Sequence, residues 1–290
     1  MLALVACGNS LTQPSAIPTS GPLPVATPTP TPTPPPRVAL ISVDGLRPDA
    51  LSETNTPGIL ALAQRGAYTL TAQTVYPSTT LPGHASMLTG MEPIGHGIDF
   101  DEYRDTFLLK APTVLSLVHA AGKRAVMVVG KDKFKQLNVG SNDGYVCALR
   151  GDADVANEAI VQLANGFDLL FVHFPQVDAV GHASGWMSPE YLEQLKETDR
   201  AVSRLIGNLP MGTTIILTAD HGGQLKSHGT QQKVDMTIPW IIVGPRVVRR
   251  GQLLTRPIRT VDTASTVLGL LGLPPPRDSV GHPLTEPFES

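Results

Sequence analysis

Continuous apolar runs alternate along the chain with longer segments whose apolar residues recur every three or four positions. The runs have the length of strands buried on both faces, and the periodic segments are typical of amphipathic helices. Strands are predicted at residues 38–43, 67–75, 124–129, 168–174, 213–219 and 238–243, and helices at 56–66, 112–121, 152–165, 188–205 and 260–271. This alternation predicts an α/β fold, a three-layer α/β/α sandwich with a mostly parallel central sheet.

The first 36 residues are predicted to lie outside the folded domain, which spans residues 37–290. Residues 9–36 are dominated by Pro, Thr and Ser, a composition that favours an extended, disordered linker. Residues 1–8 resemble a bacterial lipoprotein processing site with Cys7 as the lipid-modified residue. Because no positive segment precedes this match, we expect the natural start to lie upstream. The prediction is a membrane-anchored lipoprotein outside the cytoplasm, or otherwise a secreted or periplasmic protein; the alternative is an ordinary disordered leader.

Composition excludes several classes of function. A formal net charge of −3 argues against a generally basic nucleic-acid binder, and 5% aromatic residues argue against a stacking platform for single strands. No apolar stretch reaches the ~20 residues of a spanning helix, so membrane contact is expected only through the lipid anchor. Cys7 and Cys147 provide neither a disulfide framework nor a thiolate zinc site. The expected partner is therefore a small molecule.

The segment 76–90 combines a polar turn with a helix. It reads YPSTTLPGHASMLTG, in which a cluster of three hydroxyl residues precedes an apolar run that is predicted to be helical as far as Gly90. Such a turn presents a hydroxyl together with unpaired backbone N–H groups, which suits an anionic substrate. Taken alone, the pattern also fits a helix cap without chemistry, so the rest of the chain must decide.

Aspartate and histidine residues follow three of the predicted strands. They are Asp44, then Asp178 and His182 with the spacing D-x-x-x-H, then Asp220 and His221, with His228 seven residues further on. The carboxyl ends of parallel strands meet at one edge of a sheet, so we expect these side chains to lie together. Any one of them alone fits a turn, a cap or a core residue. Together, however, so many polar groups at the ends of buried strands would cost free energy through burial unless they were paired with one another or bound to a metal.

Oxygen and imidazole donors without a thiolate favour zinc, with manganese or iron as alternatives. Six such ligands and a hydroxyl suit two ions rather than one. Two ions roughly 3.5–4 Å apart can activate a nucleophile and neutralise a phosphoryl oxygen at the same time. Coordination would also make the hydroxyl of Thr80 reactive, because it stabilises the alkoxide without a neighbouring base.

These motifs resemble the alkaline phosphatase superfamily and, within it, the type I phosphodiesterase/nucleotide pyrophosphatase family. The matching pieces are VDGLRPD at 43–49, TLPGHASMLTG at 80–90, HGI at 96–98, DAVGH at 178–182, ADHG at 219–222 and His228. The resemblance implies two metal sites, one held by Asp44, Thr80, Asp220 and His221, and the other by Asp178, His182 and His228. It also implies that Thr80 attacks phosphorus and forms a phospho-threonine intermediate. Thr79 is the rival nucleophile.

Asp101 and Lys131 are the predicted substrate-binding residues. Gly83 and Asp101 stand where the family usually has asparagine, and at the position of Asp101 that asparagine helps to hold a phosphoryl oxygen. An ionised Asp101 would repel the oxygen, so it either points away, as part of a solvated acidic loop, or changes the specificity. Lys131 is interpreted as a cation for a substrate phosphate or carboxylate, or as part of an exposed charged turn. Residues 111–114 and 129–134 loosely resemble phosphonoacetate hydrolase, and both interpretations of Lys131 are left open.

The leading hypothesis is a two-metal phosphoric ester hydrolase of the phosphodiesterase or nucleotide pyrophosphatase type, acting on a small phosphate ester or a nucleotide. The alternatives are a phosphonoacetate-type phosphonate hydrolase and a phosphomonoesterase. A sulfatase is disfavoured because the nucleophile position lacks a C/S-x-P-x-R motif. A non-catalytic surface binding module on a degenerate enzyme fold would have lost ligands, and none of the seven is missing. The natural substrate and the oligomeric state are left open.

Overall fold

The structure, a computed structural model, describes residues 35–109, 111–140 and 143–289. They belong to a unit that spans Pro34–Ser290. The lipoprotein-like segment predicted at 1–8 and nearly all of the linker predicted at 9–36 lie outside the described residues. Within the described part of the chain, no helix combines the length and the apolar composition needed to cross a bilayer.

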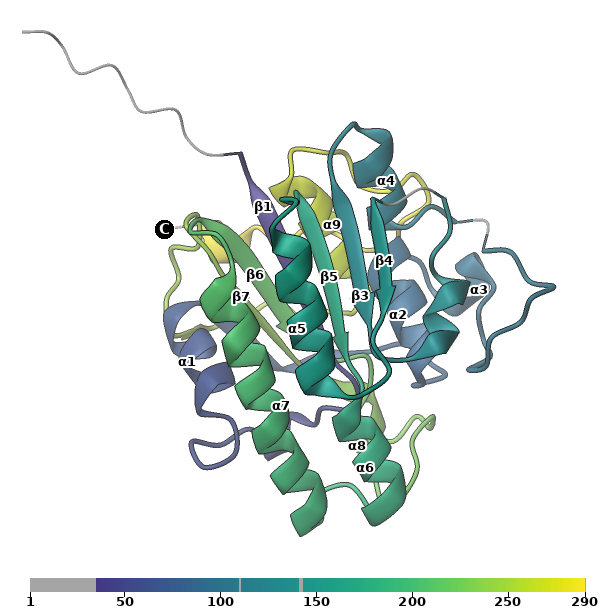
Figure 1. Cartoon of the computed structure of the whole chain (residues 1–290), viewed down its shortest axis with the longest axis vertical. Helices are drawn as coiled ribbons and strands as arrows, with labels where there is room; N and C mark the ends of the chain where they lie inside the picture. Colours follow the sequence, from purple (N-terminus) through teal and green to yellow (C-terminus); the bar gives the residue numbers. More distant parts are fainter. Residues whose placement is uncertain (1–34, 110, 141–142, 290) are drawn as a thin grey trace, which may run out of the picture. The chain divides into compact units, whose positions relative to one another are not determined.

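The described residues form an eight-stranded sheet with the order β4-β3-β5-β1-β6-β7-β2-β8 (Figure 1). β7 runs antiparallel to both of its neighbours, and every other neighbouring pair is parallel. The predicted mostly parallel sheet is therefore confirmed, and so are all six predicted strands. The strands are β1 (Arg37–Val43), β2 (Ala67–Gln73), β3 (Ala125–Val129), β4 (Gly144–Cys147), β5 (Leu169–Phe174), β6 (Thr213–Thr218), β7 (Thr237–Val243) and β8 (Gln252–Leu253).

Helices cover both faces of the sheet. One face carries α1 (Pro57–Arg65), α5 (Asp152–Leu163), α6 (Gln176–Ser184) and α7 (Pro189–Asn208). The other carries α2 (Thr80–Thr89), α4 (Val114–Ala120) and α9 (Asp262–Leu270), so that in Figure 1 α5 and α7 lie in front of the sheet and α9 behind it. The three-layer prediction is confirmed. The short helices are α3 (Pro93–His96), α8 (Lys233–Met236) and the 3-10 turns η1 (Pro48–Ala50), η2 (Asp132–Gln136) and η3 (Glu286–Phe288).

Apart from the three 3-10 turns, five elements were not predicted, namely β4, β8, α3, α6 and α8. The two strands are short, and β4 is half-buried along its whole length while β8 is exposed. They therefore lack the continuous apolar run by which a buried strand is recognised. Two of the three helices have four residues, and α6 buries only three of its nine. An apolar stripe cannot develop over so few buried positions.

The core strands bring their carboxyl ends to one edge of the sheet. β3, β5, β1 and β6 are adjacent and parallel, and nearly all of their residues are buried. The loops after these strands therefore converge. β2 leads through residues 74–79 to the amino end of α2 at the same edge. α2 is buried over all ten residues and ends at Gly90, whose positive φ of 72° suits glycine.

Candidate functional site

Each predicted ligand lies at the edge where the strands end. Asp44 directly follows β1, Asp220 and His221 follow β6, and Lys131 follows β3 after one glycine. α6 begins just beyond β5 and carries two more of the predicted ligands. Thr80 is the first residue of α2. The convergence that was predicted from the strand ends is what the structure shows for this set of residues.

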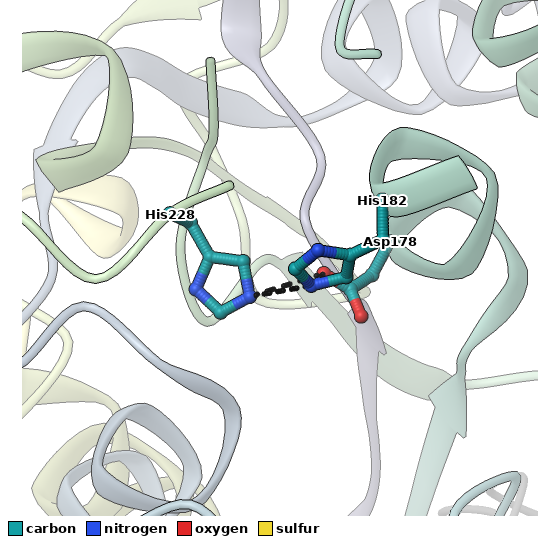
Figure 2. Close-up of side chains that lie close together, drawn as sticks. All are labelled: Asp178, His182 and His228. Carbon is teal, nitrogen blue, oxygen red and sulfur yellow. Dashed lines mark hydrogen bonds and ion pairs between the residues drawn. The ribbon is translucent and has the colours of Figure 1, made fainter. Parts of the chain in front are cut away.

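Asp178, His182 and His228 form a triangle of donor atoms. The Nε2 atoms of His182 and His228 lie 3.5 and 3.4 Å from Asp178 Oδ1, and 3.0 Å from each other. Figure 2 shows the two imidazole rings facing one another beside the carboxylate. Ligands bound tetrahedrally to zinc at ~2.0 Å lie about 3.3 Å apart, so the triangle has the dimensions of a zinc site.

Hydrogen bonds on the far side of each ring fix which nitrogen carries the proton. The Nδ1–H groups of His182, His221 and His228 donate to the carbonyl oxygens of Lys226, Gly222 and Ser78, at 3.0, 2.7 and 3.0 Å. In the neutral ring, each Nε2 therefore presents a lone pair to the site. Burial, followed by the nearby His221, lowers the pKa of His228 to about 4. The Nε2 atoms of His182 and His228 face each other at 3.0 Å, an arrangement that suits a cation bound between two imidazole rings.

A second group of donor atoms surrounds His221. Its Nε2 lies 3.3 Å from Asp44 Oδ1 and 3.3 Å from Asp220 Oδ2, and 4.0 Å from Asp178 Oδ1. Asp178 therefore lies between the two groups of donor atoms. The other oxygen of Asp220, Oδ1, accepts a hydrogen bond from the Gly45 N–H at 3.2 Å. Donor atoms of Asp44, Asp178 and His221 all lie within 4.8 Å of one another, so these three residues could hold a metal ion. The resemblance implied Asp220 in place of Asp178.

The charges of this second group are unbalanced without a bound cation. Burial and then the Asp44 charge raise the pKa of Asp220 well above its usual value. Burial lowers the pKa of His221, but the neighbouring Asp220 and Asp44 carboxylates outweigh it and raise that pKa to about 10. Both shifts express an excess of buried negative charge, which protons relieve when no other cation is present.

Four buried polar atoms of the site have no hydrogen-bond partner among the described residues. They are Asp44 Oδ1, Asp178 Oδ1, Asp220 Oδ2 and His221 Nε2. Leaving such atoms unpaired costs free energy, and native proteins rarely do so without a reason. All four belong to oxygen and imidazole donors that face the same space, and this is the donor chemistry of zinc. The residues therefore fit a metal centre.

Lys131 lies inside the site and not on an exposed turn. Its Nζ is 2.7 Å from Asp44 Oδ2, 2.5 Å from Asp178 Oδ2 and 3.4 Å from Thr80 Oγ1. Burial opposes its charge, but the two carboxylates outweigh burial and raise the pKa of Lys131 above its usual value. The interpretation as an exposed charged turn is therefore wrong. Lys131 contacts the Oδ2 atoms of Asp44 and Asp178, and the Oδ1 atoms of the same two residues face His221.

Asp101 lies at the amino end of α2, beside Thr80. Its Oδ1 accepts the N–H of Leu81 at 2.8 Å, and its Oδ2 pairs with Lys133 Nζ at 2.8 Å. The carboxylate therefore neither points away nor belongs to a purely solvated loop. The carboxylate accepts from a backbone N–H at the start of the helix that would otherwise be available to a bound anion. Lys133 balances the charge of the carboxylate. The main chain of Thr80 is held separately, because His84 Nδ1 donates to its carbonyl at 2.8 Å.

Two residues with roles at the site were missed from the sequence. Trp186 donates from Nε1 to the Gly45 carbonyl at 2.9 Å, and its ring lies so close to Gly181 and Gly223 that a Cβ there would be 2.7 and 2.2 Å from it. Trp186 thus supports the loops that carry the metal-ligand candidates. His173 donates to Asp44 from within β5. The only sequence signal for His173 was an imidazole in an otherwise apolar strand.

The fold is that of the alkaline phosphatase superfamily. It is similar to murine ectonucleotide pyrophosphatase/phosphodiesterase 5, with a TM-score of 0.71 and 16% identity over 85% of this chain and 96% of that one. It is also similar to a 2-O GAG sulfatase, with a TM-score of 0.71 and 17% identity over 88% of this chain and 74% of that one.

The sequence comparison is more specific. The profile of the family described as type I phosphodiesterase/nucleotide pyrophosphatase matches residues 38–115 and 130–237, so the chain belongs to this family. The catalytic subunit of human GPI ethanolamine phosphate transferase 2 is 27% identical over 269 residues, which are 84% of this chain and 27% of the human protein. The chain thus spans about a quarter of the length of that relative.

Proposed function

We propose that the chain is a two-metal phosphoric ester hydrolase that uses Thr80 as its nucleophile. The observation that carries the proposal is the set of four donor atoms of Asp44, Asp178, Asp220 and His221 that are buried without a partner in the described chain, next to Thr80. Membership of a phosphodiesterase family supports the reaction class. Zinc is the proposed metal because carboxylate and imidazole donors meet at tetrahedral spacings, with manganese or iron as alternatives.

The ligand sets follow from the two groups of donors. Asp178, His182 and His228 would hold one ion, and Asp44, Asp220 and His221, together with the Thr80 oxygen, would hold the other. Bound ions of this kind activate a hydroxyl nucleophile and neutralise phosphoryl oxygens. The same carboxylate of Asp178 also borders the second group, so the two sites lie next to each other.

Thr80, Lys131 and the amino end of α2 have different roles in the proposed reaction. Thr80 Oγ1 forms a bond to phosphorus while the bond from phosphorus to the leaving alcohol or nucleotide breaks; water then hydrolyses the phospho-threonine and restores the hydroxyl. The ammonium of Lys131, 3.4 Å from Thr80 Oγ1, stabilises negative charge on that oxygen as its proton passes to solvent, and the leaving alcohol or nucleotide takes up a proton from solvent. The amino end of α2, which begins at Thr80, faces the phosphoryl group with its positive dipole.

The proposed substrates are small phosphodiesters and nucleotides. The murine neighbour was solved with AMP as an inactive threonine-to-alanine variant, which supports both a nucleotide ligand and a threonine nucleophile. The human relative is named an ethanolamine phosphate transferase. A phosphonate or phosphomonoester hydrolase is the second candidate, because the ammonium of Lys131 lies 3.4 Å from Thr80 Oγ1 and could contact a second anionic oxygen of the substrate.

The proposal is tested by metal analysis and a substrate panel. We expect two zinc ions per wild-type chain and faster turnover of diesters than of monoesters or phosphonates. Thr80→Ala should lose nearly all turnover but retain the ions, since six ligands remain. Thr79→Ala is the matched control and should stay active. One ion or none at saturating zinc, or full activity of Thr80→Ala, would contradict the proposal.

A further inference from the structure

His173 is a buried histidine whose two nitrogens are both committed. It lies in β5, which is fully buried. Its Nε2 is 2.8 Å from Asp44 Oδ2, and its Nδ1 lies 3.3 Å from the backbone nitrogen of Gly130. Its ring packs against the rings of Phe134 and His84, with centroid distances of 4.3 and 5.1 Å. The ring therefore has little freedom to rotate.

The Gly130 contact determines the tautomer of His173. A backbone N–H can only donate, so Nδ1 must accept and carries no proton. The proton of the neutral ring is then on Nε2, which donates to Asp44. Gly130 can approach this closely because it has no side chain: a Cβ there would lie 2.3 Å from Pro175.

Among the described residues, hydrogen bonds from side chains reach only one of the two carboxylate oxygens of Asp44. Asp44 Oδ2 receives the Nε2–H of His173 and the ammonium of Lys131, at 2.8 and 2.7 Å. Asp44 Oδ1 accepts no hydrogen bond from any described residue and faces His221 Nε2 at 3.3 Å. Gly130 and Lys131 are consecutive, so one loop after β3 both sets the tautomer of His173 and supplies the second donor.

We propose that His173 is a positioning residue which makes Asp44 a ligand through one oxygen, Oδ1, to the metal ion shared with Asp220 and His221. This inference rests on the proposed function, since it presumes that a metal binds there. With Oδ2 occupied by two donors, the carboxylate cannot turn to bind through both oxygens. A hydrogen bond from a fixed ring orients a ligand in this way in many metal sites.

A pair of variants separates the hydrogen bond from packing. His173→Gln places its amide nitrogen near the position of Nε2 and keeps a donor to Asp44. His173→Asn is too short to reach Asp44, although its oxygen can still accept from Gly130. Zinc titration calorimetry on the full chain should show that His173→Asn weakens one of the two ions about 10- to 100-fold and leaves the other unchanged. His173→Gln should keep most of the wild-type affinity.

Two further measurements complete the test. Phe134→Leu is the packing control, because it removes the ring against His173 without removing a hydrogen bond, and we expect both zinc affinities to persist. Nitrogen NMR of histidine-labelled, zinc-loaded wild type should show His173 protonated at Nε2, and this readout does not depend on any variant folding. Protonation at Nδ1, unchanged zinc affinity in His173→Asn, or equal losses in the Gln and Asn variants would overturn the inference. Absence of zinc binding by the wild type would instead overturn the proposed function.

Discussion

Replacing Lys131 by methionine should destabilise the metal-free protein more than the zinc-loaded protein. Methionine keeps the length of the side chain but removes the ammonium that lies 2.7 and 2.5 Å from the Asp44 and Asp178 carboxylates. Both carboxylates are almost completely buried. In the absence of zinc they would lose one of the two positive charges beside them, and protonated His221 would remain. If zinc binds as proposed, the other oxygens of the same two residues would contact a divalent cation, which would compensate for the lost ammonium.

The magnitude follows from the burial of the pair. Breaking a buried ion pair by removing one partner costs about 3–5 kcal/mol. For a domain of the size of residues 37–290, each kcal/mol shifts the melting temperature by about 2–4 °C, so the loss in a chelator should be roughly 6–20 °C. The loss in excess zinc should be much smaller. Thermal unfolding of wild type and variant, each in chelator and in excess zinc, measures the difference.

Lys135→Met serves as the matched control. Lys135 pairs with Asp132 at 2.6 Å, but both side chains are about half exposed. An exposed pair contributes only about 0–1 kcal/mol, so this variant should melt close to wild type in both conditions. Equal losses for Lys131→Met with and without zinc, or a loss no larger than that of the control, would refute the reasoning that Lys131 neutralises the metal-free site.

Three other changes test separate parts of the structure. Asp101→Asn keeps an acceptor for the Leu81 N–H but frees the ammonium of Lys133, so kcat/KM for anionic diesters should rise about tenfold, the value of one hydrogen bond to a charged group; an unchanged rate on every ester would remove Asp101 from the substrate site. Burial raises the pKa of Asp152 to about 6, so its stabilising contribution is present below pH ~4 and is lost as the pH rises through 6, a change of about 3 kcal/mol. Between pH 4 and 8 the free energy of unfolding, measured with urea, should therefore fall by about 3 kcal/mol less in Asp152→Asn than in wild type. Identical pH profiles of the two proteins would contradict the raised pKa of Asp152. Cys7→Ser should move the protein from the membrane to the soluble fraction of a lipoprotein-competent host, and identical fractionation would favour the ordinary leader.

The strands and the clustering of the candidate ligands could be predicted because both depend on local patterns. An apolar run such as residues 38–43 must be buried whatever surrounds it, and an aspartate directly after it must lie at the carboxyl edge of the sheet. Several such residues in one chain therefore define a common site. The edge strand β4 escaped prediction for the opposite reason, since its half-buried residues carry no such pattern.

The contacts between loops could not be predicted. The sequence placed Lys131 on the correct side of the sheet, but whether its ammonium reaches Asp44 depends on the path of residues 130–136 relative to β1. Asp101 was interpreted from its charge alone, and only the fold shows that it accepts from Leu81 and pairs with Lys133. In the same way, the hydrogen bond from His173 to Asp44 joins residues 129 positions apart. Pairings of this range depend on tertiary structure.

The balance of charge at the site favours a diester as the substrate. Asp44, Asp178 and Asp220 bring three negative charges, and Lys131 returns one positive charge, while Asp101 and Lys133 cancel each other. With two divalent cations and neutral histidines, the site would carry two net positive charges. A phosphodiester monoanion and the Thr80 alkoxide together carry two negative charges and would neutralise the site. A phosphomonoester dianion would leave one negative charge uncompensated in a largely buried site, where an unpaired charge is costly. On this reasoning the diester should be turned over faster than the monoester in the substrate panel.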